Sequence, residues 1–379
     1  MRSGGLAMAL TKIRLGEYIT RSTKNNRDLT YGMDLITGVT SDGVFATPKG
    51  NPIEVDLQPY KIVNNGAFVY NPTRIDLGSI AYRTEGLCIV SHLYIIFYLN
   101  EKGKKIIDPT WLYIYFRRNE FRREVRFRNF GSQRPEFSFS DMSDIEIPLP
   151  DLPTQKKYVE IYNAMVSNQE SYERGLEDLK LVCDGYIEDL RRTMPCKKIG
   201  GYLNEENNRN TNLQTLNVQG VNSSSTFGET RANTNGLDFR NYKIVKTNQF
   251  AYNPSRINLG SIALYKEEED CIISPMYCVF SVINHDDLLP EYLMLWFSRK
   301  EFQRSTLFYA MGSVRDTFDY GLMKDVEIPI PSIEVQKSIA NIYGCYVQRK
   351  KINEQLKTQI RDICPILIKG SMEEAKKEA

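Results

Sequence analysis

The chain carries nearly the same segment twice: YNPTRIDLGSIAY begins at Tyr70, and YNPSRINLGSIAL begins at Tyr252. Flanking segments match in the same order, namely LGEY with IGGY, KIVNNGAF with KIVKTNQF, GSQRPEFSF with GSVRDTFDY, and IEIPLP with VEIPIP. The two copies follow one plan over about 180 residues each, whereas solenoid repeats recur every 20 to 50 residues or so. The sequence therefore predicts a duplicated domain.

Each copy combines strand signals with helix signals. Short segments rich in β-branched and aromatic residues, such as AFVY, SIAY, LCIV and YIIFYL, are separated by Gly and Asn and are typical of strands. The segments PTWLYIYFRRNEFRREV and PEYLMLWFSRKEFQRS then place apolar residues at helical spacing. Both copies are therefore expected to be α+β.

A long uninterrupted helical pattern follows each copy. Pro153 is suited to the first turn of one helix, and Pro195 stops it. Ser332 is a candidate N-cap for the other helix, which we expect Pro365 to end or kink. The predicted organisation is residues 1–151 for the first domain, 152–194 for the first long helix, 195–331 for the second domain, and 332–379 for the second long helix and tail.

Both long segments carry a heptad pattern, which predicts an antiparallel helix pair with an internal pseudo-twofold. Polar residues fall within the predicted seam at Asn168, Arg349 and Asn353. A buried polar residue in a seam can fix the register of two helices, so one hypothesis gives these residues that role. The alternative is that they face solvent or another subunit.

Composition and missing motifs exclude several classes of protein. The formal net charge is only +2, and no apolar run approaches the roughly 20 residues that span a bilayer. The seven cysteines form no CxxC, and with only two histidines the sequence predicts buried thiols and no metal site. P-loop, Rossmann, HExxH and GxSxG motifs are all missing, which argues against a single-chain enzyme.

The candidate ligand-binding residues lie mainly in the repeated loops. Arg74 and Arg256 occupy matching positions where a guanidinium group suits guanine or a phosphate, and the competing role is an internal ion pair with a carboxylate such as Asp76. Asn71 and Asn253 precede proline, where capping a turn competes with reading adenine.

Further candidates are polar residues in loops and on one basic helix. Arg122 and Arg126 lie in a basic segment that suits either phosphate contacts or a solvated helix with Glu–Arg pairs. The remaining candidates follow a glycine, where a phosphate clamp competes with a tight turn, or lie in polar loops that differ between the copies. These residues are Ser132, Arg134, Ser313 and Arg315 after glycine, and Lys49 and Arg231 in the variable loops.

The chain resembles the specificity subunit of Type I restriction–modification enzymes. The resemblance is carried by the duplicated domain, by IPLPDLPTQKK and IPIPSIEVQKS leading into long helices, and by the GSQR and GSVR elements upstream. It implies two target recognition domains that each read one part of a split DNA site, and a helix pair that fixes the unread gap. The close likeness of the two copies suggests related half-sites.

The resemblance also implies partners. Double-stranded DNA and two modification (methyltransferase) subunits are expected to bind, and ATP-dependent restriction subunits can join them. The chain itself is expected to be non-catalytic, cytoplasmic and free of cofactors, with S-adenosylmethionine, ATP and Mg on the partner subunits. The alternative is a coiled-coil scaffold whose duplicated domains bind proteins instead of DNA.

Overall fold

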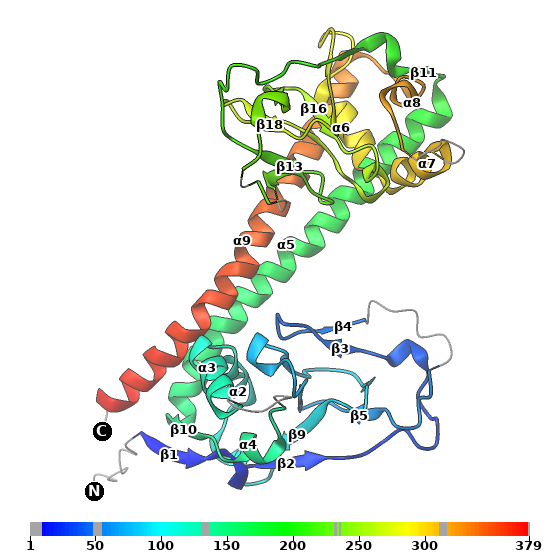
Figure 1. The fold of residues 1–379 in the computed structure, drawn as a ribbon. Coiled ribbons are helices and arrows are strands. Elements are labelled where there is room, and N and C mark those ends of the chain that lie inside the picture. The colour runs from blue at the N-terminus through cyan, green and yellow to red at the C-terminus, as the bar shows by residue number, and fades with distance from the viewer. Residues whose placement is uncertain are drawn as a thin grey trace, which may run out of the picture. The chain divides into compact units, whose positions relative to one another are not determined.

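The computed structural model describes residues 10–47, 55–129, 136–230, 233–234, 236–310 and 317–377. The chain divides into two compact units (Figure 1). Unit 1 comprises Met1–Glu170 with Glu354–Ala379, and unit 2 comprises Ser171–Asn353. Each unit therefore contains one copy of the repeat together with one part of each long helix, and each is α+β as predicted.

Unit 1 is built around a four-stranded antiparallel sheet in the order β2-β9-β6-β7, with two-stranded pairs β1-β10, β3-β4 and β5-β8. Its strands are β1 (Thr11–Arg14), β2 (Ile19–Ser22), β3 (Gly38–Val39), β4 (Phe45–Ala46), β5 (Lys61–Val63), β6 (Ala67–Tyr70), β7 (Ile80–Tyr82), β8 (Cys88–Val90), β9 (Ile95–Leu99) and β10 (Glu146–Leu149). Its helices are α1 (Gly103–Ile106), α2 (Pro109–Phe116), α3 (Asn119–Arg128) and α4 (Phe139–Ser143), with 3₁₀ helices at Leu15–Glu17, Met33–Leu35 and Ile75–Leu77.

Unit 2 repeats this topology, with the sheet β12-β19-β16-β17 and the pairs β11-β20, β13-β14 and β15-β18. Its strands are β11 (Cys196–Lys198), β12 (Leu203–Glu205), β13 (Gln219–Val221), β14 (Phe227–Glu229), β15 (Lys243–Val245), β16 (Phe250–Tyr252), β17 (Ile262–Leu264), β18 (Cys271–Ile273), β19 (Cys278–Val282) and β20 (Glu327–Pro329). Its helices are α6 (Pro290–Ser298), α7 (Lys300–Ala310) and α8 (Tyr320–Lys324), with 3₁₀ helices at Ile199–Tyr202, Phe239–Asn241 and Ile257–Leu259.

The central strands β6 and β16 are buried on both faces, which explains why these repeated strands are apolar throughout. In β6, Phe68 and Tyr70 join the core beneath the helices, whereas Ala67 and Val69 join a second cluster beneath the β3-β4 hairpin. Side chains alternate between the faces of a strand, so both sets need apolar partners. In unit 2, Phe250 and Tyr252 pack in the same way on one face of β16.

The basic segment that was expected to be one helix is divided into α2 and α3. Arg118 leaves the helical region with φ −72° and ψ 150°, and its Nε donates to the carbonyl oxygen of Tyr115 at 3.0 Å. This contact satisfies one of the carbonyl groups that a helix leaves free at its C-terminus. Unit 2 breaks at the matching residue, Arg299, which separates α6 from α7.

The two long helices are α5 (Leu152–Thr193) and α9 (Ile333–Lys377), of 42 and 45 residues. The helix α9 runs through Pro365, so the alternative in which Pro365 ends the helix is wrong. A proline inside a helix costs about 3 kcal/mol. Leu367 and Ile368 beyond it are buried in the core of unit 1, and full burial of such side chains contributes about 1.5–3 kcal/mol each, which offsets that cost.

Within each unit the segments of α5 and α9 pack antiparallel. In unit 1, Lys157 Nζ lies 2.7 Å from Glu374 Oε1, and Tyr162, farther along α5, packs against the apolar cluster that contains Cys364 of α9. In unit 2, Arg349 lies over the ring of Tyr172 at 5.7 Å. The predicted antiparallel arrangement is confirmed within both units.

The buried stripe of α5 lies one residue beyond the predicted seam. Beyond the first turns of α5, the buried residues are Val159, Gln169, Leu176, Cys183 and Ile187, whereas Asn168 is exposed. The prediction placed a polar residue in the seam of α5, and the structure places Gln169 there instead. On α9, Asn353 is buried as expected, but Arg349 is exposed.

Candidate functional site

The repeated YNPxR segment forms the same loop in both units. In unit 1 the Oδ1 atom of Asn71 accepts hydrogen bonds from the backbone N–H and the hydroxyl of Thr73 at 3.0 and 2.9 Å. Gly78 ends the following 3₁₀ helix in the left-handed region at φ 100°, which favours glycine. Asn71 therefore shapes the turn through its side-chain oxygen, as an Asx turn does.

The loop of unit 2 repeats these contacts with different residues. Asn253 Oδ1 accepts from the N–H of Ser255 at 3.0 Å, and Gly260 takes φ 88°. Ser261 donates its hydroxyl to the carbonyl of Val221 at 2.9 Å, as Ser79 does to Val39. Both loops are thus fixed to the hairpin beside them by an identical buried hydrogen bond.

The loop presents one arginine to solvent in each unit. Arg74 and Arg256 have nearly identical backbone angles, φ −133° and −135°, and both are exposed. Among the described residues, neither guanidinium group has a hydrogen bond or an ion pair. Asp76, the carboxylate considered as an internal partner of Arg74, is instead paired with Arg126, whose Nε lies 3.3 Å from Asp76 Oδ2.

A second repeated motif lies against this loop. The backbone N–H of Phe137 donates to the carbonyl of Pro72 at 2.9 Å, and Phe318 donates to Pro254 at 3.0 Å. The GSxR elements immediately precede these phenylalanines in the sequence.

Six predicted site residues lie outside the described part of the chain, namely Lys49, Ser132, Arg134, Arg231, Ser313 and Arg315.

The basic helix α3 adds two more candidate residues to the same face of unit 1. Arg126 is exposed and is held beside the loop by its ion pair with Asp76. Arg122 is half-buried, and its Nε makes no hydrogen bond with any described residue. The structure therefore brings Arg74, Arg122 and Arg126 to one part of unit 1, around the 3₁₀ helix Ile75–Leu77.

One pair of residues that the sequence analysis missed connects each domain to its long helix. Gln155 is fully buried; its Oε1 accepts from the N–H of Asp108 at 2.7 Å, and its Nε2 donates to the carbonyls of Ile106 and Pro150 at 2.8 and 2.7 Å. Gln336 makes the matching contacts in unit 2, with Leu289, Asp287 and Pro331. The signal was present in the sequence as the Gln of TQKK and VQKS.

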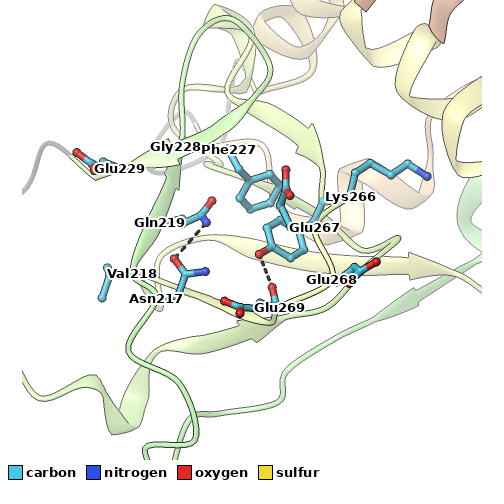
Figure 2. A pocket seen from close by; sticks show the side chains of 11 residues that line it. Asn217, Val218, Gln219, Phe227, Gly228, Glu229, Lys266, Glu267, Glu268 and Glu269 are labelled. Carbon is cyan, nitrogen blue, oxygen red and sulfur yellow. Dashed lines mark hydrogen bonds between the residues drawn. The ribbon is translucent and has the colours of Figure 1, made fainter. Parts of the chain in front are cut away.

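A pocket in unit 2 is lined mainly by acidic and amide side chains. It has a volume of about 840 Å³ and is shown in Figure 2. Its wall combines Asn217 and Gln219, which share a hydrogen bond of 3.2 Å, with Glu229 and the turn Glu267–Glu269. Carboxylates at this density repel phosphate groups but can accept hydrogen bonds from base amino groups.

No group of acidic, histidine or cysteine side chains suited to a metal ion occurs among the described residues. His92 and His285 are both exposed. All seven cysteines are free thiols, and Cys88, Cys183, Cys271 and Cys364 are buried. None of the helices in the described part of the chain combines the length and apolar character needed to cross a bilayer.

The fold and the two matching loops define a protein with two equivalent α+β binding units joined to long helices. The sequence matches the family described as "Type I restriction modification DNA specificity domain" twice, over residues 12–179 and 197–362. The chain therefore belongs to this family. A comparison with curated proteins gives no match.

Solved structures resemble the chain over almost its full length. The S subunit of a Type I restriction–modification system from M. genitalium has a TM-score of 0.57 at 11% identity, with 95% of each chain covered. The HsdS subunit from Thermoanaerobacter tengcongensis has a TM-score of 0.38 at 14% identity, with 97% of each chain covered. A chain from a study of assembly and conformational transition of the type I R-M system has a TM-score of 0.46 at 14% identity, covering 95% of this chain and 97% of that one.

Proposed function

We propose that this chain is the DNA-recognition subunit of a Type I restriction–modification complex. Each unit reads one part of a bipartite site. The observation that carries this proposal is the duplicated YNPxR loop, which in both units presents an exposed arginine in the same backbone conformation and without an ion pair to any described residue. A protein that meets two half-sites of one duplex needs the same binding element twice.

The long helices would set the unread gap between the two parts of the site and would dock two modification subunits. Helices of 42 and 45 residues are roughly 60 to 70 Å long at about 1.5 Å per residue. The buried Gln155 and Gln336 support this role, because each ties a domain to the start of its helix through three hydrogen bonds. A domain held in this way follows the helix instead of rotating freely.

The chain would contribute recognition and no catalysis. S-adenosylmethionine would bind to the modification subunits, and ATP with Mg would bind to restriction subunits where these join. The units differ at the acidic turn Glu267–Glu269, which matches Thr84–Gly86 in unit 1. We infer that such differences let the two units read different bases, while the shared loop makes the shared contacts.

Mapping methylated adenines across the genome, with and without this gene, tests the proposal. The expected result is the loss of methylation at one bipartite motif when the gene is deleted, and its return on complementation. An unchanged methylation map in a strain with active modification subunits would contradict the proposal and would favour the scaffold alternative.

A further inference from the structure

We propose that unit 1 contains a binding site for a DNA backbone phosphate, formed by Arg122 of α3 and Arg361 of α9, and that unit 2 has no equivalent of it. This inference rests on the proposed function. It implies that the two units bind DNA with different strength although their loops are alike. Unit 1 makes an additional phosphate contact with the half-site that it reads.

The first observation is the position of Arg122. Its guanidinium group lies directly over Gly78, because a Cβ atom added to that glycine would come within 2.5 Å of Nη2 of Arg122. Its Nε is buried and makes no hydrogen bond with a described residue. Arg117 nearby differs, since its Nη1 donates to the carbonyl of Gly78 at 2.6 Å and to Ser41 at 3.3 Å.

The second observation is the charge around Arg122. Burial lowers the pKa of Arg122, and the positive charges of Arg117, Arg361 and Arg126 lower it further, whereas Asp42 opposes them. Arg126 and Arg361 already have their own carboxylates, Asp76 and Asp362. A half-buried arginine among other cations is stabilised by an external anion, and guanidinium groups match phosphate geometry through paired N–H donors.

Unit 2 has the same scaffold with different side chains. Phe302 of α7 is equivalent to Phe121 of α3. The ring of Phe302 packs on Phe297 with centroids 4.8 Å apart, and that of Phe121 packs on Phe116 at 4.9 Å. The next residue is Gln303, whose Nε2 lies 3.1 Å from a Cβ atom added to Gly260. A neutral amide thus occupies the position that Arg122 holds over Gly78.

The helix beside this position carries a cation in both units, and the units differ in the residues that follow it. Gln155 of α5 and Gln336 of α9 are equivalent residues. Lys180 follows Gln155 at the same separation at which Arg361 follows Gln336, so Lys180 and Arg361 occupy equivalent positions. The segment of α5 near Lys180 carries Asp184 and Glu188, which lie 3.4 and 3.7 Å from the guanidinium group of Arg299. The charge of Arg299 is therefore offset by two carboxylates of α5, whereas no described residue forms an ion pair with Arg122.

The ligand class follows from these contrasts. Around Arg122 the three neighbouring arginines outnumber the opposing carboxylate of Asp42, so the site suits an anion with several oxygen acceptors. It lies on the same part of unit 1 as the exposed Arg74, which the proposed function places on DNA. A phosphodiester group of the DNA backbone fits both conditions.

The test compares Arg122→Gln and Arg361→Gln with the matched control Gln303→Ala in the full chain, purified with modification subunits if DNA binding requires them. Affinity is measured against salt concentration for the cognate duplex and for a scrambled duplex. Each lost phosphate contact reduces the slope of log K against log salt by about 0.9. We expect that reduction for both arginine variants on both duplexes, and no change for Gln303→Ala.

Phosphate-ethylation interference should also identify, on one half-site only, a phosphate whose ethylation weakens binding. Arg122→Gln should abolish this interference. A wild-type slope in both arginine variants would overturn the inference, as would a loss confined to the cognate duplex, which would indicate base reading. If Arg122→Gln does not fold, the exposed Arg361→Gln decides. A wild-type chain that binds no DNA would instead overturn the proposed function.

Discussion

The backbone N–H of Phe137 donates to the carbonyl oxygen of Pro72 at 2.9 Å, and Phe318 makes the same bond to Pro254 at 3.0 Å. The rings of these phenylalanines also meet Tyr70 and Tyr252 edge to face, at 6.2 and 6.3 Å between centroids. Two motifs that are about 60 residues apart in each copy are therefore held together by one hydrogen bond and one buried aromatic pair. This junction positions the arginine loop in both units.

Replacing Arg74 with Ala should weaken specific DNA binding by about 1–3 kcal/mol if the side chain reads a base, because the discriminating hydrogen bonds are lost. Arg256→Ala should weaken contacts with the other half-site only. Affinities for duplexes altered in one half-site at a time measure both effects. Arg240→Ala, which removes an exposed arginine paired with Asp238, is the control, and unchanged affinity in Arg74→Ala would remove Arg74 from the site.

Replacing Gln155 with Ala should destabilise unit 1 strongly. The change leaves the N–H of Asp108 and the carbonyls of Ile106 and Pro150 buried without their partner. Each such group costs about 1–3 kcal/mol, so the free energy of unfolding should fall by roughly 3 kcal/mol or more. Urea denaturation measures the loss, and Lys156→Ala, at an exposed neighbouring position, should cost almost nothing; equal effects of the two changes would contradict the account.

Stability should decrease at alkaline pH because several thiols are buried. Burial raises the pKa of Cys183 and Cys364 to about 11 and that of Cys271 to about 12, against about 8.5 for a cysteine in an unfolded chain. Above that value the unfolded state releases these protons first and binds fewer protons than the native state, so the free energy of unfolding falls as pH rises.

The decrease should begin near pH 8.5, before the tyrosines of an unfolded chain ionise at about 10. Urea denaturation at a series of pH values between 7.5 and about 9.5 measures it. A variant with Ala at Cys183, Cys271 and Cys364 should show a flatter profile. A flat profile in the unchanged protein would show that these thiols are not buried as described.

Replacing Asn353 with Leu should allow more than one alignment of α5 and α9, because a buried polar residue can restrict a helix pair to one register. Spin labels at the exposed Lys156 and Lys376, both in unit 1, report the alignment as a distance distribution. We expect one distance in the unchanged chain and several in Asn353→Leu. Asn168→Leu changes an exposed residue and should keep one distance, and a single distance in Asn353→Leu would refute the register role.

The sequence was sufficient to predict the duplication, the α+β class and the two long helices, because each depends on patterns that repeat. The strands around Phe68 and Phe250 and the helix start at Pro153 could be predicted from local residue preferences. The break at Arg118 could not, since it depends on a contact between its guanidinium group and the ring and carbonyl of Tyr115.

The errors in the long helices share one physical origin. The continuation through Pro365 depends on the burial of Leu367 and Ile368 in unit 1, and the shift of the seam from Asn168 to Gln169 depends on which face of α5 the domain covers. A heptad pattern predicts only how two helices pack on each other, so it predicts neither of these contacts with the domain. The same limit concealed the role of Gln155: the Gln of TQKK recurs in VQKS, but its hydrogen-bond partners are known only from the fold.

The proposal that the long helices set the gap between the two half-sites can be tested by lengthening both. One heptad inserted after Glu170 in α5 and one after Asn353 in α9 adds about 10 Å to each helix. At 3.4 Å per base pair, the methylated motif should keep both half-sites while its unread gap grows by about three base pairs. A methylation map with the gap unchanged would contradict the account.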